Sequence, residues 1–287
     1  MRVIAVCNLK GGVAKTTTTV NLAADLAVDH EQRVLVIDAD SQCNSTAFLS
    51  AEAERTDCHA NAEALARNDR NGESGKGDTL ADLLRMPQNE RTEFSVSFYL
   101  EIAIRRSSVE GVDLLPGDPS LMDLDLSKVE ADTVFTEVLA RGLPDLKKRY
   151  DFVLIDCPPA FNAASAAALL AADEVLIPIK LDAFALDGMT NLMQQIANMR
   201  RINPRLRVLG LLPVMWYRSE QISRAEAALR ESGLPVLPRI RRSNRVDDMT
   251  FAQKPLIVCS PKSAACQDYR RLATRIAARG GDGNENF

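Results

Sequence analysis

Short, continuously apolar runs alternate with longer helical patterns along the whole chain, and this alternation most constrains the possible fold. The apolar runs are Val3–Cys7, Val34–Ile37, Val112–Leu115, Phe152–Ile155, Val175–Ile179 and Val208–Val214. The helical stretches are Thr16–Val28, Asp132–Lys148, Ala163–Ala172, Leu186–Met199, Glu220–Glu231 and Ala264–Ala278. Runs without polar alternation are typical of parallel strands that are covered on both faces. The pattern therefore predicts an α/β fold, a doubly wound, mostly parallel sheet with helices on both faces.

Two segments fall outside this pattern. Ala51–Asp78 carries eleven charged residues, three Asn and three Gly, but only one large aliphatic residue, Leu65. Such a composition cannot bury a core, so we predict a mobile surface insertion. The polar tail Gly280–Phe287 is predicted to be disordered. The length of 287 residues suits one large α/β domain, which we place at residues 1–279.

Composition indicates a soluble, cytoplasmic protein. No apolar stretch approaches the roughly 18–20 residues that span a bilayer, and we expect no signal peptide before the first strand. Six scattered cysteines form no C-x-x-C pair, which is typical of reduced thiols in the cytosol. The only two histidines, His30 and His59, lie in polar surroundings, which argues against a histidine triad or zinc site.

The joint between the first strand and the first helix has the composition of a phosphate-binding loop. Residues 8–18 read NLKGGVAKTTT. Backbone N–H groups of a glycine-rich turn and a helix N-terminus converge on an anion, a lysine reaches the β- and γ-phosphates, and the next hydroxyl can ligate Mg²⁺. Lys15 and Thr16 suit these roles, and Gly11 and Gly12 allow close approach of the backbone. A plain strand–turn–helix joint would also fit these residues.

Carboxylates follow two of the predicted strands. Asp38 and Asp40 come directly after Val34–Ile37, and Asp156 follows Phe152–Ile155. In a parallel sheet ligands bind beyond the carboxyl ends of the strands. A carboxylate there can orient an attacking water or lie near Mg²⁺. Taken alone, an aspartate pair at a strand end can equally be a turn or a helix cap.

Arginines concentrate in one part of the chain. Between Arg200 and Arg245 there are eleven arginines, three glutamates and no lysine or aspartate, a local charge of +8 in a chain of net charge −4. Four of them lie in Pro238–Arg245, which we predict to be a loop. Clustered arginines suit sequence-independent contact with nucleic-acid phosphates. The alternative is a solvated face with internal ion pairs, for which three glutamates are too few.

These segments resemble the ParA/MinD family of ATPases. Lys10–Thr16 is similar to the deviant Walker A motif K-G-G-x-x-K-[ST], and residues 38–44 are similar to D-x-D-P-Q-x-N, with Ser41 in place of proline. The ordinary motif G-x-x-x-x-G-K-[ST] is not met, because Leu9 and Ala14 occupy its glycine positions. The family has glycine where this chain has Ala14. If that position needs a positive φ, alanine strains the loop by about 1 kcal/mol or more.

The resemblance continues from about Arg2 to Ala278. Asp156 and the two prolines after it resemble the family's Walker B and switch II segments, and Arg218 matches an arginine that follows a strand. Pro238, Arg239 and Arg242 match P-R-x-x-R, and residues 260–269 are similar to the start of the closing helix. Residues 213–217 depart from the family, which usually has a Thr-Met there and an aspartate nearby.

The resemblance implies a role for each matched residue. ATP would be held by Lys10, Gly11, Gly12, Val13, Ala14, Lys15, Thr16 and Thr17, with its adenine near Pro238. Lys10, Lys15 and Asp40 would be catalytic, with Lys10 reaching the partner subunit's ATP and Asp40 activating water. Thr16, Asp38 and Asp156 would hold Mg²⁺. Arg218, Arg239, Arg242 and Arg245 would bind DNA.

The implied function is a weak ATPase that acts as a switch in plasmid partition or chromosome segregation. It would form an ATP-dependent homodimer on non-specific double-stranded DNA, be reset by hydrolysis that a ParB-type protein stimulates, and be cytoplasmic, on the nucleoid and not on membranes. We expect no helix-turn-helix domain before the first strand. One alternative is a MinD-type membrane ATPase, which needs a free terminal amphipathic helix, whereas Ala264–Ala278 is predicted to be core. Another is a small-molecule ATP-dependent ligase, which needs neither Lys10 nor the arginines. An iron–sulfur relative is disfavoured by the cysteine spacing.

Overall fold

A computed structural model describes residues 1–50, 79–86, 88–90, 92–124, 139, 142, 144, 146–182 and 185–278. The predicted insertion at residues 51–78 and the predicted tail at 280–287 lie outside the described residues. So does most of the predicted helix Asp132–Lys148.

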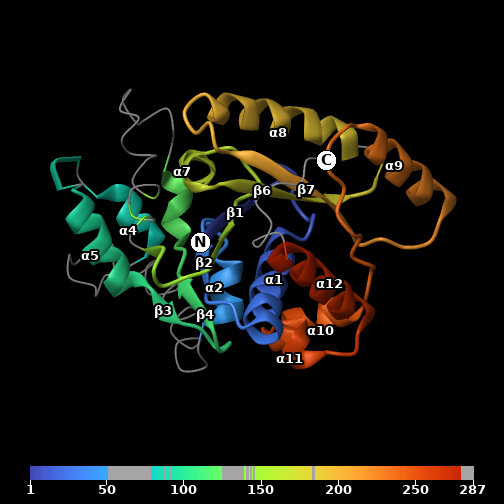
Figure 1. The fold of residues 1–287 in the computed structure, drawn as a ribbon, viewed down its shortest axis with the longest axis horizontal. Coiled ribbons are helices and arrows are strands. Elements are labelled where there is room, and N and C mark those ends of the chain that lie inside the picture. The colour runs from blue at the N-terminus through green and yellow to red at the C-terminus, as the bar shows by residue number, and fades with distance from the viewer. Residues whose placement is uncertain are drawn as a thin grey trace.

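The described part contains a seven-stranded sheet in the order β3-β4-β2-β5-β1-β6-β7 (Figure 1). Its strands are β1 (Arg2–Val6), β2 (Val34–Asp38), β3 (Arg105–Arg106), β4 (Val112–Leu115), β5 (Phe152–Asp156), β6 (Glu174–Lys180) and β7 (Arg207–Val214). All neighbouring strands are parallel except β3 and β4. The predicted doubly wound parallel sheet is therefore confirmed. The antiparallel edge strand β3 was not predicted, because two charged residues carry no strand pattern.

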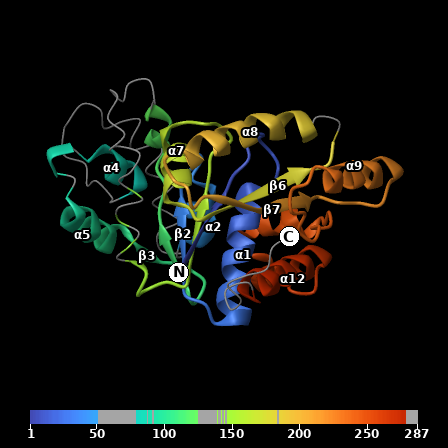
Figure 2. The ribbon, with the colours of Figure 1, turned by 45° about the horizontal axis from the view of Figure 1, so that its top comes forward.

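Helices cover both faces of the sheet. They are α1 (Lys15–His30), α2 (Asn44–Leu49), α4 (Leu80–Arg85), α5 (Glu93–Ala103), α7 (Ala163–Ala171), α8 (Ala185–Arg200), α9 (Glu220–Glu231), α10 (Arg245–Ala252), α11 (Leu256–Cys259) and α12 (Ala264–Ala278), with short 3₁₀ turns at Gln88–Glu90 and Pro119–Asp123. Side chains alternate between the two faces along each strand. Thus Val3 and Ala5 of β1 belong to the core under α7, α8 and α9, whereas Ile4 and Val6 belong to the core under α1 and α12. Figure 2 shows α4 and α5 at one end of the molecule and α9 and α12 at the other.

The predicted helices that lie within the described chain are confirmed, and their bounds differ by no more than two residues. The helices that were not predicted (α2, α4, α5, α10 and α11) are between four and eleven residues long. Segments as short as α2 or α11 show too few turns for a helical period to stand out. The prediction that Pro238–Arg245 is wholly a loop is wrong at its end, because Arg245 begins α10.

The last helix is part of the core. Tyr269, Leu272 and Ile276 of α12 are buried, and the Tyr269 hydroxyl lies 3.2 Å from Thr18 Oγ1 of α1. This confirms the prediction for Ala264–Ala278 and leaves this helix unable to lie on lipid without exposing the core. Within the described chain, no helix combines the length and the apolar character that crossing a bilayer requires.

Candidate nucleotide site and arginine surface

The loop between β1 and α1 has two residues in the left-handed region. Gly12 has φ 69°, and Ala14, the N-cap of α1, has φ 57° and ψ 37°. Ala14 therefore has a positive φ, the case in which alanine strains the loop by about 1 kcal/mol. The loop nevertheless leads directly into the N-terminus of a 16-residue helix. Free N–H groups and the helix dipole favour an anion at that point.

Two lysines bracket the loop. Lys15 is buried, and its ammonium donates to the carbonyl oxygen of Lys10 at 3.2 Å, so its side chain spans the loop. Lys10 donates through its own ammonium to both carboxylate oxygens of Asp182, at 2.8 and 2.7 Å. The Asn8 side chain holds the loop entrance, because Oδ1 accepts from the Lys10 N–H and Nδ2 donates to the carbonyl of Pro178. The two lysines thus lie at one edge of the sheet, at the ends of β1 and β6.

Asp38 and Asp156 are the last residues of β2 and β5 and are register partners on these adjacent strands. Both are completely buried. Burial raises the pKa of Asp38, and the neighbouring charge of Asp156 raises it further. Burial also raises the pKa of Asp156, against hydrogen bonds from Ser45 and Thr16 that lower it. Two buried carboxylates that resist ionisation together favour a cation between or beside them.

The oxygen donors at this point suit Mg²⁺. Thr16, at the start of α1, lies close enough to Asp156 to lower the pKa of that carboxyl, so a hydroxyl and a carboxylate predicted to face the metal lie near each other. Asp156 accepts hydrogen bonds from Ser45 Oγ at 2.7 Å and from Thr19 Oγ1 at 3.5 Å. Hard oxygen ligands of this kind are those that Mg²⁺ prefers. Asp38 is more strongly engaged by protein groups: its Oδ2 accepts from the N–H and hydroxyl of Thr46 at 2.7 and 2.8 Å.

The Asp40 carboxylate stabilises its own turn and also lies close to Asp156. Its Oδ1 accepts from the Gln42 N–H at 3.0 Å, and the Asp40 N–H donates to Asp38 at 3.2 Å, so part of the turn alternative holds. The side chain is also close enough to Asp156 for its charge to raise the pKa of that carboxyl. The structure therefore brings four predicted site residues together at the carboxyl ends of the central strands, namely Asp40, Asp156, Thr16 and Lys15.

A hollow of about 310 Å³ opens beside the phosphate loop. Ala14 and Thr17 line it on the loop side, and Val214, Met215 and Ile240 give it apolar walls. Polar and charged side chains, among them Lys180, Arg242 and Asn244, complete the lining. A concave site with apolar walls and polar side chains beside them suits a planar base. Pro238 is not among its lining residues, and lines instead a separate cleft between α9 and α12.

The segment that carries Pro238 runs along the edge of the sheet. Leu237 donates to the carbonyl of Leu211 at 2.8 Å and Ile240 to that of Pro213 at 2.8 Å, so this segment follows β7 in parallel. The last of these bonds, from the Arg242 N–H to the Trp216 carbonyl, is 2.8 Å long. Consequently Ile240 faces the hollow, while Pro238 lies nearer the middle of β7.

Ion pairs neutralise about half of the eleven arginines between Arg200 and Arg245. Six form ion pairs with other described residues, namely Arg207, Arg224, Arg230, Arg239, Arg241 and Arg245. Their partners include Glu174, Asp248 and Asp268, which lie outside the arginine-rich segment. The alternative of internal ion pairs thus holds for about half of the set.

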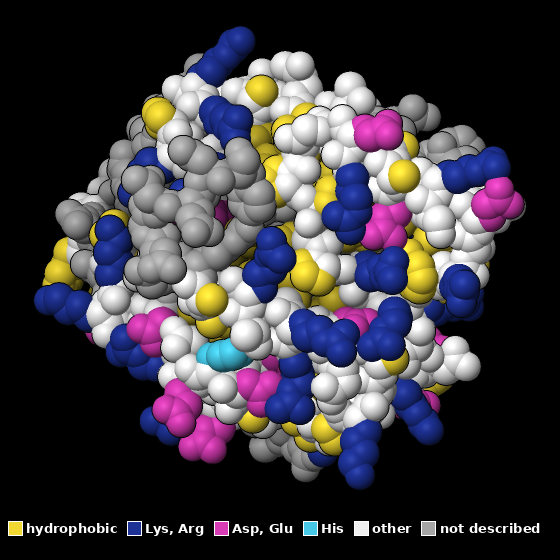
Figure 3. Space-filling model, turned by 45° about the vertical axis from the view of Figure 1, so that its right-hand side comes forward, with side chains coloured by type: hydrophobic (Ala, Val, Ile, Leu, Met, Phe, Trp, Pro, Cys, Tyr) yellow, Lys and Arg dark blue, Asp and Glu magenta, His cyan; other side chains and the backbone are white. Residues whose placement is uncertain are grey.

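Among the four arginines predicted to bind DNA, Arg239 pairs with Glu226 and Arg245 with Asp248. Arg218 and Arg242 are exposed, and neither has an ion-pair partner among the described residues. Figure 3 shows lysine and arginine side chains spread over the α9–α12 side of the molecule, with acidic side chains between them.

Comparison with known proteins identifies the family. The family model described as an AAA domain matches residues 1–208. The chromosome partitioning protein ParA of Caulobacter vibrioides is 32% identical over 97% of this chain and 95% of its own length. This chain belongs to the ParA/Soj family of ATPases. The chromosome-partitioning ATPase Soj of Thermus thermophilus is also 32% identical, over 97% of this chain and 96% of the relative.

The likeness extends to solved structures. Cobyrinic acid a,c-diamide synthase from Mycobacterium smegmatis, crystallised with bound ADP and magnesium, superposes with a TM-score of 0.74 at 26% identity. The alignment covers 99% of this chain and 97% of the synthase. The same fold therefore occurs in a diamide synthase as well as in chromosome partitioning proteins, so the site must decide the function.

Several residues of this ParA/Soj-type site were not predicted. Ser45 and Thr46 of α2 bind Asp156 and Asp38, and Asp182 binds Lys10. The apolar walls of the hollow, Met215 and Ile240, were also missed. One signal was available: Asp182 comes two residues after the sixth strand, at the edge where ligands bind.

Proposed function

We propose that this ParA/Soj-type ATPase binds ATP with Mg²⁺ and hydrolyses it slowly, as the switch of a DNA partition system. In this proposal Lys15 and the N–H groups of residues 10–17 bind the β- and γ-phosphates. Thr16 and Asp156, with Asp38 behind them, would hold Mg²⁺, which neutralises charge on the phosphate oxygens. The observation that carries the proposal is the convergence of Lys15, Thr16, Asp40 and Asp156 at one end of the sheet.

Asp40 is proposed to orient the attacking water. Its Oδ1 is used by the Gln42 N–H, which fixes the carboxylate in position. Hydrolysis needs little covalent chemistry from the protein, so positioning of the water and of the phosphates accounts for most of the rate. We propose the hollow beside Ala14 and Thr17 as the base site, in place of Pro238, because it adjoins the phosphate loop.

Dimerisation would couple ATP to DNA. Lys10 is proposed to leave Asp182 and contact the ATP of a second copy of this chain. The dimer would then present two arginine surfaces, with Arg218 and Arg242 as the principal phosphate contacts because neither guanidinium has an acidic partner in the described chain. Arg239 and Arg245 would each contribute less net positive charge, since each is paired with a carboxylate. A ParB-type protein would stimulate hydrolysis, and the protein would lie on the nucleoid in the cytoplasm.

One experiment tests the proposal directly. Retardation of duplex DNA by the purified protein is measured with ATP, with ADP and without nucleotide, at two salt concentrations. We expect strong, sequence-independent binding with ATP only, weakening steeply as salt rises. The Lys15→Ala protein, which should not bind ATP, serves as the control. Equal retardation in all three nucleotide states would contradict the switch.

A ligase is the second candidate, since a synthase shares the fold at 26% identity. A ligase would form ADP only when a small-molecule acid and an amine donor are supplied, and DNA would change nothing. ADP formation by the protein alone, accelerated by DNA together with a ParB-type protein, would favour the partition ATPase.

A further inference from the structure

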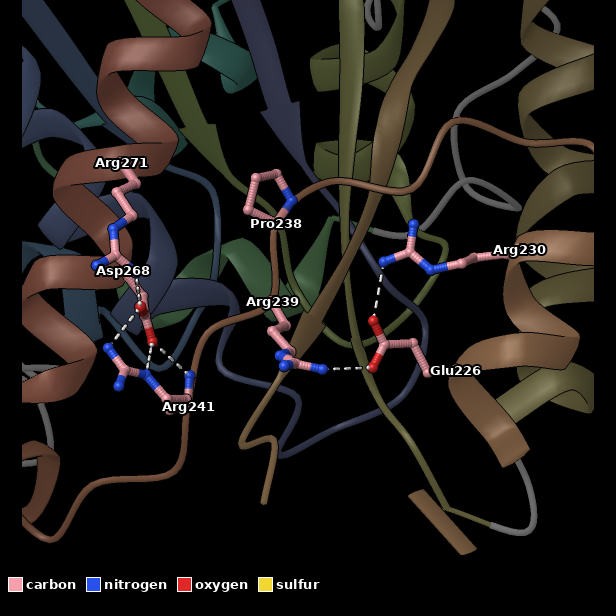
Figure 4. A pocket seen from close by; sticks show the side chains of 7 residues that line it. All are labelled: Glu226, Arg230, Pro238, Arg239, Arg241, Asp268 and Arg271. Atoms are coloured by element: carbon pink, nitrogen blue, oxygen red, sulfur yellow. Dashed lines mark hydrogen bonds and ion pairs between the residues drawn. The ribbon is translucent and has the colours of Figure 1, made fainter. Parts of the chain in front are cut away.

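A cleft of about 510 Å³ lies between α9 and α12 on the arginine surface. Glu226 and Arg230 line it from α9, and Asp268 and Arg271 line it from α12. The segment that contains Pro238, Arg239 and Arg241 passes between the two helices (Figure 4). We call this the α9–α12 cleft.

Each carboxylate in the cleft bridges two arginines. Glu226 accepts from Arg230 at 2.8 Å through one oxygen and from Arg239 at 3.1 Å through the other. On the opposite wall, Asp268 accepts from Arg241 and Arg271, whose ion-pair distances are 2.7 and 3.2 Å. The side chains of Glu226 and Asp268 are only 11% and 5% exposed, whereas those of the four arginines are 42–69% exposed. The acids therefore lie beneath the arginines.

This arrangement leaves an excess of positive charge. Four arginines face two carboxylates, so the cleft carries a net charge of +2. One arginine would be enough to neutralise each buried acid. The second guanidinium on each wall must be balanced by water or by an anion from outside.

The guanidinium groups are also held in place before any ligand arrives. The Arg239 guanidinium lies 3.6 Å from the centroid of the Trp216 ring, and the Trp216 indole N–H donates to Glu226 at 2.9 Å. Each guanidinium has five N–H donors, and Arg230, Arg239 and Arg271 each give one nitrogen to a carboxylate. Ordered arginines with donors to spare bind phosphate oxygens well, because little entropy remains to be lost.

We propose that the α9–α12 cleft binds the phosphodiester backbone of DNA, as a contact set in addition to Arg218 and Arg242. The inference rests on the proposed function, since it assumes that DNA is the partner. DNA is favoured over a free phosphate ion because the charge is divided between two walls, on α9 and α12. A duplex presents a continuous series of phosphates along its backbone, and so can supply a negative charge to each wall, whereas one phosphate ion supplies a single centre of charge.

The test removes the outer arginine of each wall. The double variant Arg230→Gln, Arg271→Gln leaves Glu226 paired with Arg239 and Asp268 paired with Arg241, so no buried acid loses all its partners. The matched control is Arg201→Gln, Arg205→Gln. It removes the same charge from two exposed arginines that lie before the start of β7. The segment that lines the cleft runs beside the second half of β7, so the control arginines lie away from the cleft.

DNA affinity is measured with saturating ATP over a range of salt concentrations. Relative to the control, the cleft variant should bind duplex DNA at least about tenfold more weakly, and the slope of log affinity against log salt should fall by about 2. Its ATP affinity and its melting temperature should stay close to those of the control. Inorganic phosphate, added at constant ionic strength, is the second probe.

Three outcomes separate the possibilities. A cleft variant that binds DNA as the control does, while DNA binding still requires ATP, overturns the cleft assignment alone. Phosphate binding that the variant loses without any loss of DNA affinity assigns the cleft to free phosphate and overturns the proposal. Wild-type DNA binding that ignores ATP contradicts the proposed function itself.

Discussion

Lys10 and Asp182 form a two-pronged ion pair at the entrance to the phosphate loop. The lysine ammonium lies 2.8 and 2.7 Å from the two carboxylate oxygens, and the two side chains are 34% and 29% exposed. Since Lys10 is the residue proposed to contact the partner's ATP, Asp182 competes with the partner for it. A pair this open to solvent is worth about 1 kcal/mol at most. It would therefore adjust dimerisation and not prevent it.

Asp182→Asn should favour the ATP-bound dimer. Removal of the competing charge frees Lys10 in both subunits, and two pairs of about 1 kcal/mol each correspond to an increase of up to about thirtyfold in the dimerisation constant. Sedimentation velocity at limiting ATP measures the dimer fraction. Asp182→Glu keeps the charge and should behave more like the wild type. Weaker dimerisation of the Asn protein would mean that Asp182 acts in the dimer instead.

Ala14→Gly should stabilise the protein. Alanine at φ 57° is strained, and glycine removes that strain at a smaller cost in unfolded-state entropy, so the free energy of unfolding should rise by less than about 1 kcal/mol. Chemical denaturation without nucleotide measures the change. Ala228→Gly, at an exposed position in the middle of α9, is the control and should lower stability by about the same amount. Equal losses in both variants would show that the loop bears no strain at Ala14.

Asp25→Asn should stabilise the protein increasingly as pH rises. Asp25 is buried in α1, and neither of its oxygens has a hydrogen-bond partner among the described residues. Burial raises its pKa to about 8, Asp29 adds to the rise, and Arg270 opposes it. The unfolded chain loses this proton near pH 4, whereas the folded chain keeps it, so folded wild type loses stability between about pH 4 and pH 8.

Urea unfolding of both proteins measures this effect. The difference in the free energy of unfolding between Asp25→Asn and the wild type should grow from pH 5 to pH 8, by at most about 1.4 kcal/mol per pH unit. Taking the difference cancels the titration of Asp38 and Asp156, which both proteins share. A difference that does not change with pH would show that Asp25 titrates normally in the folded state.

Asp40→Asn should separate ATP binding from hydrolysis. Asparagine keeps an oxygen that can accept from the Gln42 N–H, so the turn should survive, but it cannot act as a base or hold water with a full charge. We expect ADP formation to fall at least about a hundredfold, while ATP affinity changes little. Phosphate release and equilibrium ATP binding are measured together. Hydrolysis at the wild-type rate would remove Asp40 from the mechanism.

The strands and long helices could be predicted because their signals are local. A strand buried on both faces, such as β5, is apolar at every position, and α12 shows its buried stripe within a few turns. The phosphate loop and the strand-end aspartates followed from the same reasoning, since their place in the chain determines the edge of the sheet where they lie.

Contacts between distant segments could not be predicted in this way. Asp268 lies 27 residues after Arg241, yet it forms the ion pair that neutralises this arginine. Asp156 likewise lies 111 residues after Ser45, so the hydrogen bond between them could not be predicted from the local sequence. Counting charges within Arg200–Arg245 overestimated the exposed positive charge, because the neutralising acids Glu174, Asp248 and Asp268 come from outside it.

The sequence alone therefore determined the layered α/β architecture, the phosphate loop and the family resemblance, because burial periodicity and short motifs are written in consecutive residues. Only the tertiary structure decided which arginines lack an ion-pair partner in the described chain, where a hollow opens beside the loop, and that Lys10 is held by Asp182. These properties depend on which side chains meet across the end of the sheet. Folding brings together the acids that neutralise an arginine, and it creates the burial that raises the pKa of a carboxyl group.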